Sequence, residues 1–162
     1  MTQRPLWAPW RIDYVRQDKS TGDCPLCAAA CGDDNTMVIA RGERCLVLLN
    51  RFPYASGHLM VLPTRHVGDF TALDADELTE TMQLAQHSVR ILTDVMAPSG
   101  FNIGLNVGQA AGAGIDEHLH LHVVPRWPGD TNFMPVLNHT NVLPQALAAT
   151  RDELVARWTA PA

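Results

Sequence analysis

Three histidines alternate with leucine along one short segment, His-Leu-His-Leu-His over residues 118–122. In a β-strand successive side chains point to opposite faces, so His118, His120 and His122 would share one face at a spacing of roughly 6.5–7 Å. Imidazole near neutral pH is a nucleophile, a proton carrier and a common metal ligand. The segment therefore predicts rings that can bind one ligand together, with a hydrolytic metal site built from all three as one interpretation and an exposed polar face without a site as the other.

The loop before these histidines is made of small residues, Gly108-Gln-Ala-Ala-Gly-Ala-Gly114. Small residues allow backbone N–H groups to approach an anion closely. The loop lacks the Gly-Lys-Ser/Thr ending of a P-loop, and Glu117 stands where a dinucleotide fingerprint needs its third glycine. Its place directly before the histidines predicts a phosphate cradle of another kind.

A Cys-x-x-Cys pair, Cys24 and Cys27, follows Gly22-Asp23 and is expected to form a tight knuckle. A redox dithiol of the thioredoxin type belongs to a βαβ unit, which this sequence does not contain. A structural zinc ion needs four ligands in a closed tetrahedron, so two more would have to come from elsewhere. Cys31 is one candidate or else a small packing residue, whereas Cys45 lies in an apolar run and is expected in the core.

The elements that must position these residues follow from periodicity. Short apolar segments bounded by turn residues predict five strands, and they cover residues 37–40, 45–49, 58–62, 101–107 and 118–124, with Pro125 ending the last. A long helix is predicted over residues 74–96, with Asp74 and Glu77 as a capping box. Its apolar stripe is Leu78, Met82, Ala85, Val89, Leu92 and Met96. A last helix is predicted over residues 143–158, and a short one over about 9–17.

Strands followed by a helix, then strands and a helix, favour an α+β fold with an antiparallel sheet and helices packed on it. The 162-residue length predicts a single domain, with an N-terminal arm over 1–22, a core over 24–130 and a C-terminal extension with a helix over 131–162. The net charge of −5 gives no general footprint for nucleic acid. No apolar run could cross a bilayer and no signal peptide is visible, so we expect a cytoplasmic protein with reduced thiols.

The histidine segment with its flanking Val123-Val124 resembles the signature of the histidine-triad (HIT) superfamily, His-φ-His-φ-His-φ-φ. Residues 49–63 are similar to the family's Asn-Arg-x-Pro-x-x-x-Gly-His segment, and the resemblance covers residues 24–130. Residues 7–11 and 129–133 resemble the bacterial branch of diadenosine tetraphosphate phosphorylase-like proteins. The resemblance implies a HIT-like fold with a five-stranded antiparallel sheet, and a homodimer.

The resemblance also implies a chemistry. The middle histidine, His120, would attack the α-phosphate of a nucleotide and form a nucleotidyl-histidine, while His122 would stabilise the developing charge. His58 is similar to the family's buried supporting histidine. The residues implied to bind the nucleotide are Leu48, Asn50, Asn106, Gln109, Gly112 and Gly114, together with His120 and His122.

Some members of the family bind zinc with Cys-x-x-Cys, the His of Pro-x-x-His and the first triad histidine. The corresponding positions here are Cys24, Cys27, His66 and His118, which implies a structural zinc ion and removes His118 from a three-histidine hydrolytic site. Cys31 in place of His66 is the rival fourth ligand.

The activity implied is cleavage of dinucleoside polyphosphates, with adenine nucleotides as substrates, by phosphorolysis or by hydrolysis. A nucleoside phosphoramidate hydrolase, a nucleotide-binding regulator without catalysis and a zinc-dependent hydrolase are the alternatives. The sequence departs from the family at residues 113–118, Ala-Gly-Ile-Asp-Glu-His, where hydrolase members carry Gln and Ser or Thr before the triad. An open phosphate site without those side chains would favour orthophosphate over water as the second nucleophile.

Overall fold

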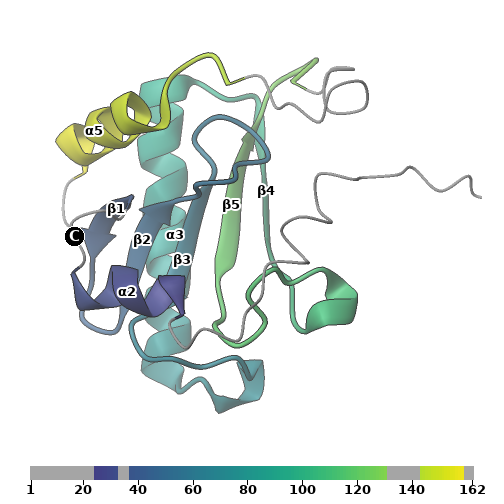
Figure 1. Ribbon diagram of the computed structural model, residues 1–162. Coiled ribbons are helices and arrows are strands. Elements are labelled where there is room, and N and C mark those ends of the chain that lie inside the picture. Colours follow the sequence, from purple (N-terminus) through teal and green to yellow (C-terminus); the bar gives the residue numbers. More distant parts are fainter. Residues whose placement is uncertain (1–23, 33–36, 131–142, 159–162) are drawn as a thin grey trace, which may run out of the picture.

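The computed structural model describes residues 24–32, 37–130 and 143–158 (Figure 1). The helix expected near residues 9–17, the rest of the N-terminal arm and residues 131–142 of the C-terminal extension lie outside this part of the chain. Among the described residues, no helix combines the length and the apolar character needed to span a membrane.

A sheet of five antiparallel strands forms the centre of the structure, which confirms the α+β prediction (Figure 1). The order across the sheet is β1-β2-β3-β5-β4. The strands are β1 (Val38–Arg41), β2 (Cys45–Leu49), β3 (Leu59–Pro63), β4 (Gly100–Leu105) and β5 (Leu121–Arg126).

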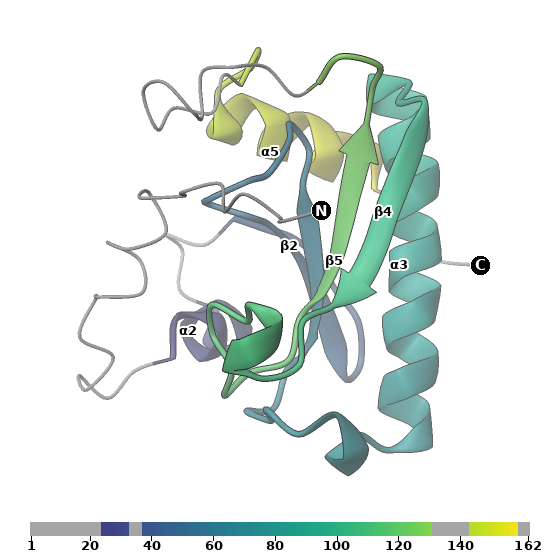
Figure 2. The same cartoon turned by 90° about the vertical axis from the view of Figure 1, so that its right-hand side faces the viewer.

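Helices cover both faces of the sheet. They are α2 (Pro25–Cys31), α3 (Ala75–Met96) and α5 (Leu147–Arg157), with 3-10 turns η1 (Phe70–Ala72) and η2 (Gln109–Ala111). Helix α3 packs across β2, β3 and β5, and α5 packs against α3 and β1. Figure 2 shows α3 on one side of the sheet, with α2 and η2 on the other.

Strand β2 is buried on both faces, which explains its continuous apolar run. Its odd-numbered residues from Cys45 to Leu49 join the core beneath α3 and α5. Leu46 and Leu48 point the other way and form a second core with Leu26, Ala29, Met60 and Leu62. We call this second side the α2 face of the sheet.

Helix α3 begins at the predicted capping box. The backbone N–H of Glu77 donates to the Asp74 carboxylate at 2.8 Å, and the N–H of Asp74 donates to the Glu77 carboxylate at 3.0 Å. The predicted apolar stripe is wrong in its first half, because Leu78 and Met82 are exposed. The helix instead turns Thr81, Leu84, Ser88 and Ile91 toward the sheet, together with Ala85 and Leu92.

The histidine strand begins later and ends later than predicted. Strand β5 starts at Leu121, so His118 and His120 precede it. The N–H of Leu119 donates to the carbonyl of Val67 at 2.8 Å, because a loop rather than a strand lies beside this part of the chain. The neighbouring Gly68 allows this approach, since a Cβ there would lie 2.6 Å from the Asp116 carbonyl oxygen. At its other end β5 continues past Pro125 to Arg126.

Cys24 and Cys27 lie at the start of a helix rather than in a knuckle. Cys24 is the N-cap of α2, and Pro25 occupies the first helical position, where its missing N–H costs nothing. Helix α2 ends at Gly32, whose φ of 92° is in the left-handed region that favours glycine. Cys31, in the last turn, is exposed and is not the packing residue that the sequence predicted.

Candidate functional site

All three histidines of the triad are buried. His118 is fully buried, and His120 and His122 expose 7% and 9% of their surface. His122 pairs with Met60 of β3 and with Gly104 of β4, which places its ring on the α2 face. The rings of His120 and His122 are perpendicular, with centroids 4.9 Å apart. The two residues predicted to be catalytic therefore lie side by side.

The ring of His120 is oriented by the main chain. Its Nδ1 donates to the carbonyl oxygen of His118 at 2.8 Å, so the proton is on Nδ1 and the lone pair is on Nε2. Burial lowers the pKa of His120, and the hydrogen bond to His118 opposes that effect. A neutral imidazole with one free nitrogen can act as a nucleophile at neutral pH.

A chain of hydrogen bonds fixes the protons of His58 and His122. The N–H of Tyr54 donates to His58 Nδ1 at 3.1 Å, so His58 carries its proton on Nε2. That Nε2 lies 2.9 Å from His122 Nδ1 and donates to it. His122 must then carry its own proton on Nε2, where it is a hydrogen-bond donor.

Asn50 holds the other side of His58. Its Oδ1 accepts from the N–H of Phe52 at 2.9 Å, and its Nδ2 lies 3.3 Å from His58 Nδ1. Asn50 was predicted to bind the nucleotide, and the structure places it at the end of β2, half-buried beside His58. Leu48, two residues earlier, is buried in the core of the α2 face.

The predicted phosphate-binding residues lie in the loop between β4 and β5. Asn106 Nδ2 is 3.5 Å from His122 Nε2, so two donors converge beside the triad. Gln109 is exposed, and its Nε2 donates to Asp116 at 2.8 Å across the loop. Gly112 ends η2 with a φ of 88°, and Gly114 follows it half-buried. Asn106 thus lies next to His122, whereas the side chain of Gln109 bonds to a residue of its own loop.

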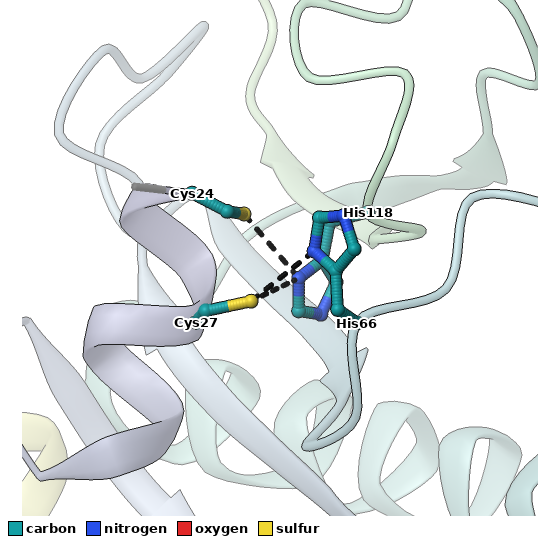
Figure 3. A group of neighbouring side chains, drawn as sticks. All are labelled: Cys24, Cys27, His66 and His118. Atoms are coloured by element: carbon teal, nitrogen blue, oxygen red, sulfur yellow. Dashed lines mark hydrogen bonds between the residues drawn. The ribbon is translucent and has the colours of Figure 1, made fainter. Parts of the chain in front are cut away.

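The four predicted metal ligands come together, although they lie in three separate segments of the chain (Figure 3). Their donor atoms all lie within 4.8 Å of one another. His118 Nδ1 is 3.5 Å from the Sγ atoms of both Cys24 and Cys27, and His66 Nδ1 is 3.2 Å from Cys27 Sγ. Ligands at 2.0–2.3 Å from a tetrahedral zinc ion would lie roughly 3.3–3.8 Å from one another, close to the 3.2–3.5 Å of these three pairs.

The orientation of His118 supports the same conclusion. Its Nε2 donates to the carbonyl oxygen of Pro63 at 2.9 Å, which leaves the lone pair on Nδ1, the atom that faces the thiols. Burial, followed by the hydrogen bond and charge of Cys24, raises the pKa of the Cys27 thiol to about 11. A cation would have to displace that proton on binding. The donor set of two thiols and two imidazoles fits zinc.

A cavity of about 360 Å³ opens next to His122, above β4 and β5. Sequence reasoning did not select most of the residues that line it, which include Tyr54, Asn102, Gly104, Arg126 and Asp130. The signal was present in part, because Asn102, Gly104 and Asn106 alternate and share one face of the strand. Arg126 and Asp130 form an ion pair, with Arg126 Nη2 2.8 Å from Asp130 Oδ1.

Comparison with known proteins places the chain in a family. The model of the HIT domain matches residues 32–129. The chain is 40% identical to AP-4-A phosphorylase of Mycobacterium tuberculosis over 94% of its own length and 83% of that protein. It is 33% identical to an uncharacterized HIT-like protein of Mycoplasma genitalium over 77% of its length and 88% of that protein.

Solved structures agree with these sequence matches. A zinc-bound histidine triad family protein from Mycobacterium smegmatis superposes with a TM-score of 0.69 at 28% identity, over 83% of this chain and 92% of that one. Diadenosine triphosphate hydrolase of Plasmodium falciparum, at 18% identity, shares the fold with a TM-score of 0.60 over 75% of this chain and 73% of that one. The match of the domain model and the similarity along nearly the whole chain show that this protein belongs to the HIT family.

Proposed function

We propose that this protein is a nucleotide-processing enzyme that cleaves dinucleoside polyphosphates through a nucleotidyl intermediate on His120. The observation that carries the proposal is the hydrogen bond from His120 Nδ1 to the His118 carbonyl, which leaves Nε2 free beside the N–H of His122. The 40% identical relative named AP-4-A phosphorylase supports the choice of substrate.

In the first step His120 Nε2 attacks the α-phosphorus, so that a P–N bond forms and the P–O bond to the rest of the polyphosphate breaks. The phosphoryl group gains negative charge as this happens. The N–H of His122 and the amide of Asn106 converge at the same place and donate to its oxygens. In the second step orthophosphate or water attacks the same phosphorus, and the P–N bond breaks to regenerate His120.

The residues around the triad are proposed to hold the nucleotide. Asn50, at the end of β2, would bind the ribose, with Leu48 and its neighbours beside the base. The backbone of the loop from Gln109 to Gly114 would approach the phosphates. The bond between Gln109 and Asp116 keeps this loop closed on itself, so Gln109 would act by shaping the loop.

We propose orthophosphate rather than water as the second nucleophile. Residues 113–117, directly before the triad, carry no Ser, Thr or Gln side chain to bind the transferred phosphate. That leaves room for an incoming anion beside the N–H of His122 and the amide of Asn106. The N–H groups of residues 111–113 already donate to carbonyls of their own loop. Diadenosine tetraphosphate would then give ADP and ATP, with the ADP formed from the AMP group and the incoming phosphate.

Cys24, Cys27, His66 and His118 are proposed to hold a zinc ion with a structural role. Zinc would cross-link α2, the loop after β3 and the segment before β5 without taking part in the reaction. Because the carbonyl of His118 orients His120, fixing His118 would also stiffen the nucleophile. The protein would supply all four ligands, so no ligand position would be open to substrate, as expected for a structural site.

The proposal is tested by incubating the protein with diadenosine tetraphosphate with and without orthophosphate. ATP and ADP should form only with phosphate, and mass spectrometry of enzyme quenched before phosphate is added should show AMP attached to His120. If ATP and AMP form at the full rate in phosphate-free buffer, the reaction is hydrolysis rather than phosphorolysis. Binding of AMP without turnover of any polyphosphate or phosphoramidate would instead support a nucleotide-binding regulator.

A further inference from the structure

The cavity beside His122 has a floor made by two paired strands. Gly104 pairs with His122, and Asn102 pairs with Val124. Directly paired residues of an antiparallel sheet point to the same side, so these positions all face the cavity from the α2 face. Gly104 leaves the floor open, since a Cβ there would meet no atom within 4 Å.

The rest of the cavity lining combines polar and aromatic groups with the aliphatic side chains of Ala55, Ile103, Leu105 and Val124. Tyr54 lies at its side, 59% exposed, with its ring centroid 5.7 Å from that of His122. At the end farthest from His122, Arg126 Nη2 donates to Asp130 at 2.8 Å and Arg126 Nη1 donates to Asn102 at 2.8 Å. The charges of Arg126 and Asp130 balance each other, so this end offers hydrogen-bond donors and acceptors rather than a net positive charge.

The cavity lies on the opposite side of His122 from the proposed nucleoside site. One row of paired residues crosses the sheet from Leu48 through Met60 and His122 to Gly104. With the reacting nucleotide held at the Leu48 end, the phosphorus lies near His120 and His122. The group that leaves that phosphorus then extends toward Gly104 and the cavity.

We propose that this cavity binds the nucleoside of the leaving group, so that a dinucleoside polyphosphate is held at both ends. This inference rests on the proposed function. It explains why the enzyme would prefer dinucleoside polyphosphates to substrates with one nucleoside. The volume of about 360 Å³ falls within the range of small-molecule sites, about 300–1,000 Å³. The ring of Tyr54 can stack on a base, and the Arg126–Asp130–Asn102 group can bind hydroxyls or a base edge. An ammonia leaving group, as in a phosphoramidate, would use none of these contacts.

The test compares diadenosine tetraphosphate with adenosine 5′-tetraphosphate, which has the same phosphate chain without the second nucleoside. The quantity measured is the ratio of kcat/KM for the two substrates in saturating phosphate. Gly104→Leu fills the floor of the cavity, and this ratio should fall about tenfold or more. Gln83→Leu is the control, because Gln83 is exposed in α3, on the other face of the sheet, and does not line the cavity. Its ratio should equal that of the unmodified protein.

Asn102→Ala provides a second variant farther from His122. It removes one hydrogen-bonding group from the end of the cavity, and the ratio should fall about three- to tenfold. Unchanged ratios in both variants, or equal losses on both substrates, would overturn the inference while leaving the cleavage activity established. Failure of the unmodified protein to cleave either substrate would overturn the proposed function and this inference together.

Discussion

His58 Nε2 donates a hydrogen bond of 2.9 Å to His122 Nδ1, and the two rings are buried together. The direction of this bond is set from outside the pair, because the N–H of Tyr54 already donates to the other nitrogen of His58. One backbone amide therefore determines which of the four ring nitrogens of His58 and His122 carry a proton. His122 is left with its N–H directed at the place where phosphate is proposed to react.

His58→Leu should lower kcat for diadenosine tetraphosphate about 100-fold with little change in KM. The reason is that His122 loses the partner that keeps its proton on Nε2, and one oriented donor is worth about 10²–10³ in kcat. His58→Gln retains an N–H that can reach His122, so most of the rate should return. If both variants lose equal activity and equal thermal stability, His58 only fills space.

His120→Ala should reduce turnover by at least about 10³-fold, because no other described nitrogen is held with a free lone pair at this place. His120→Gly leaves a space for free imidazole, and adding imidazole should restore part of the rate. Steady-state kinetics measures the turnover of each variant, and a thermal melt checks that the variant is folded. Activity of His120→Ala within tenfold of the unmodified protein would eliminate the covalent intermediate.

The purified protein should contain one zinc ion per chain by elemental analysis, and chelation should lower Tm by about 10 °C or more. Cys27→Ser should lose the metal, because Cys27 Sγ lies within 3.5 Å of the ring nitrogens of both His66 and His118. Cys31→Ser is the matched control and should keep a full zinc ion, since Cys31 is exposed and outside the cluster. Loss of zinc from Cys31→Ser but not from His66→Ala would make Cys31 the fourth ligand.

The free energy of unfolding should fall as the pH drops from about 6.5 toward 4. Burial, followed by the positive charges of His122 and His120, lowers the pKa of His58 to about 3. Burial and then the charge of His120 lower the pKa of His122 to about 4. In this window the unfolded chain binds protons at both residues, near its ordinary pKa of about 6.5, and the folded protein does not.

Urea denaturation at pH 7.0, 6.0 and 5.0 measures this effect. His58→Gln removes one of the two groups, so it should lose less stability than the unmodified protein between pH 7.0 and 5.0. Equal losses of stability in the two proteins would show that folding does not lower the pKa of His58.

Local sequence patterns determined the sheet and the ends of the long helix. The apolar run of β2 and the capping box of Asp74 and Glu77 depend on residues within a few positions of one another, so they can be read directly from the sequence. The four clustered Cys and His residues came from the resemblance to the family. The prediction that Leu78 and Met82 are buried was wrong because it rested on local periodicity alone. Periodicity gives the spacing of a helix's apolar residues but not the angle at which the helix meets the sheet.

The tertiary structure decided which residues of the site are joined by hydrogen bonds. The bond between His58 and His122 joins residues 64 positions apart, and the start of β5 was displaced because Leu119 bonds to Val67 rather than to a strand. The cavity at Gly104 exists because β4 and β5 pair in one register and Tyr54 comes beside them. Such contacts depend on which distant segments pack together, since hydrogen bonds and close packing act only between atoms that are already neighbours in space. The sequence determined which groups could react, and the packing of distant segments determined which nitrogen of each ring is free to do so.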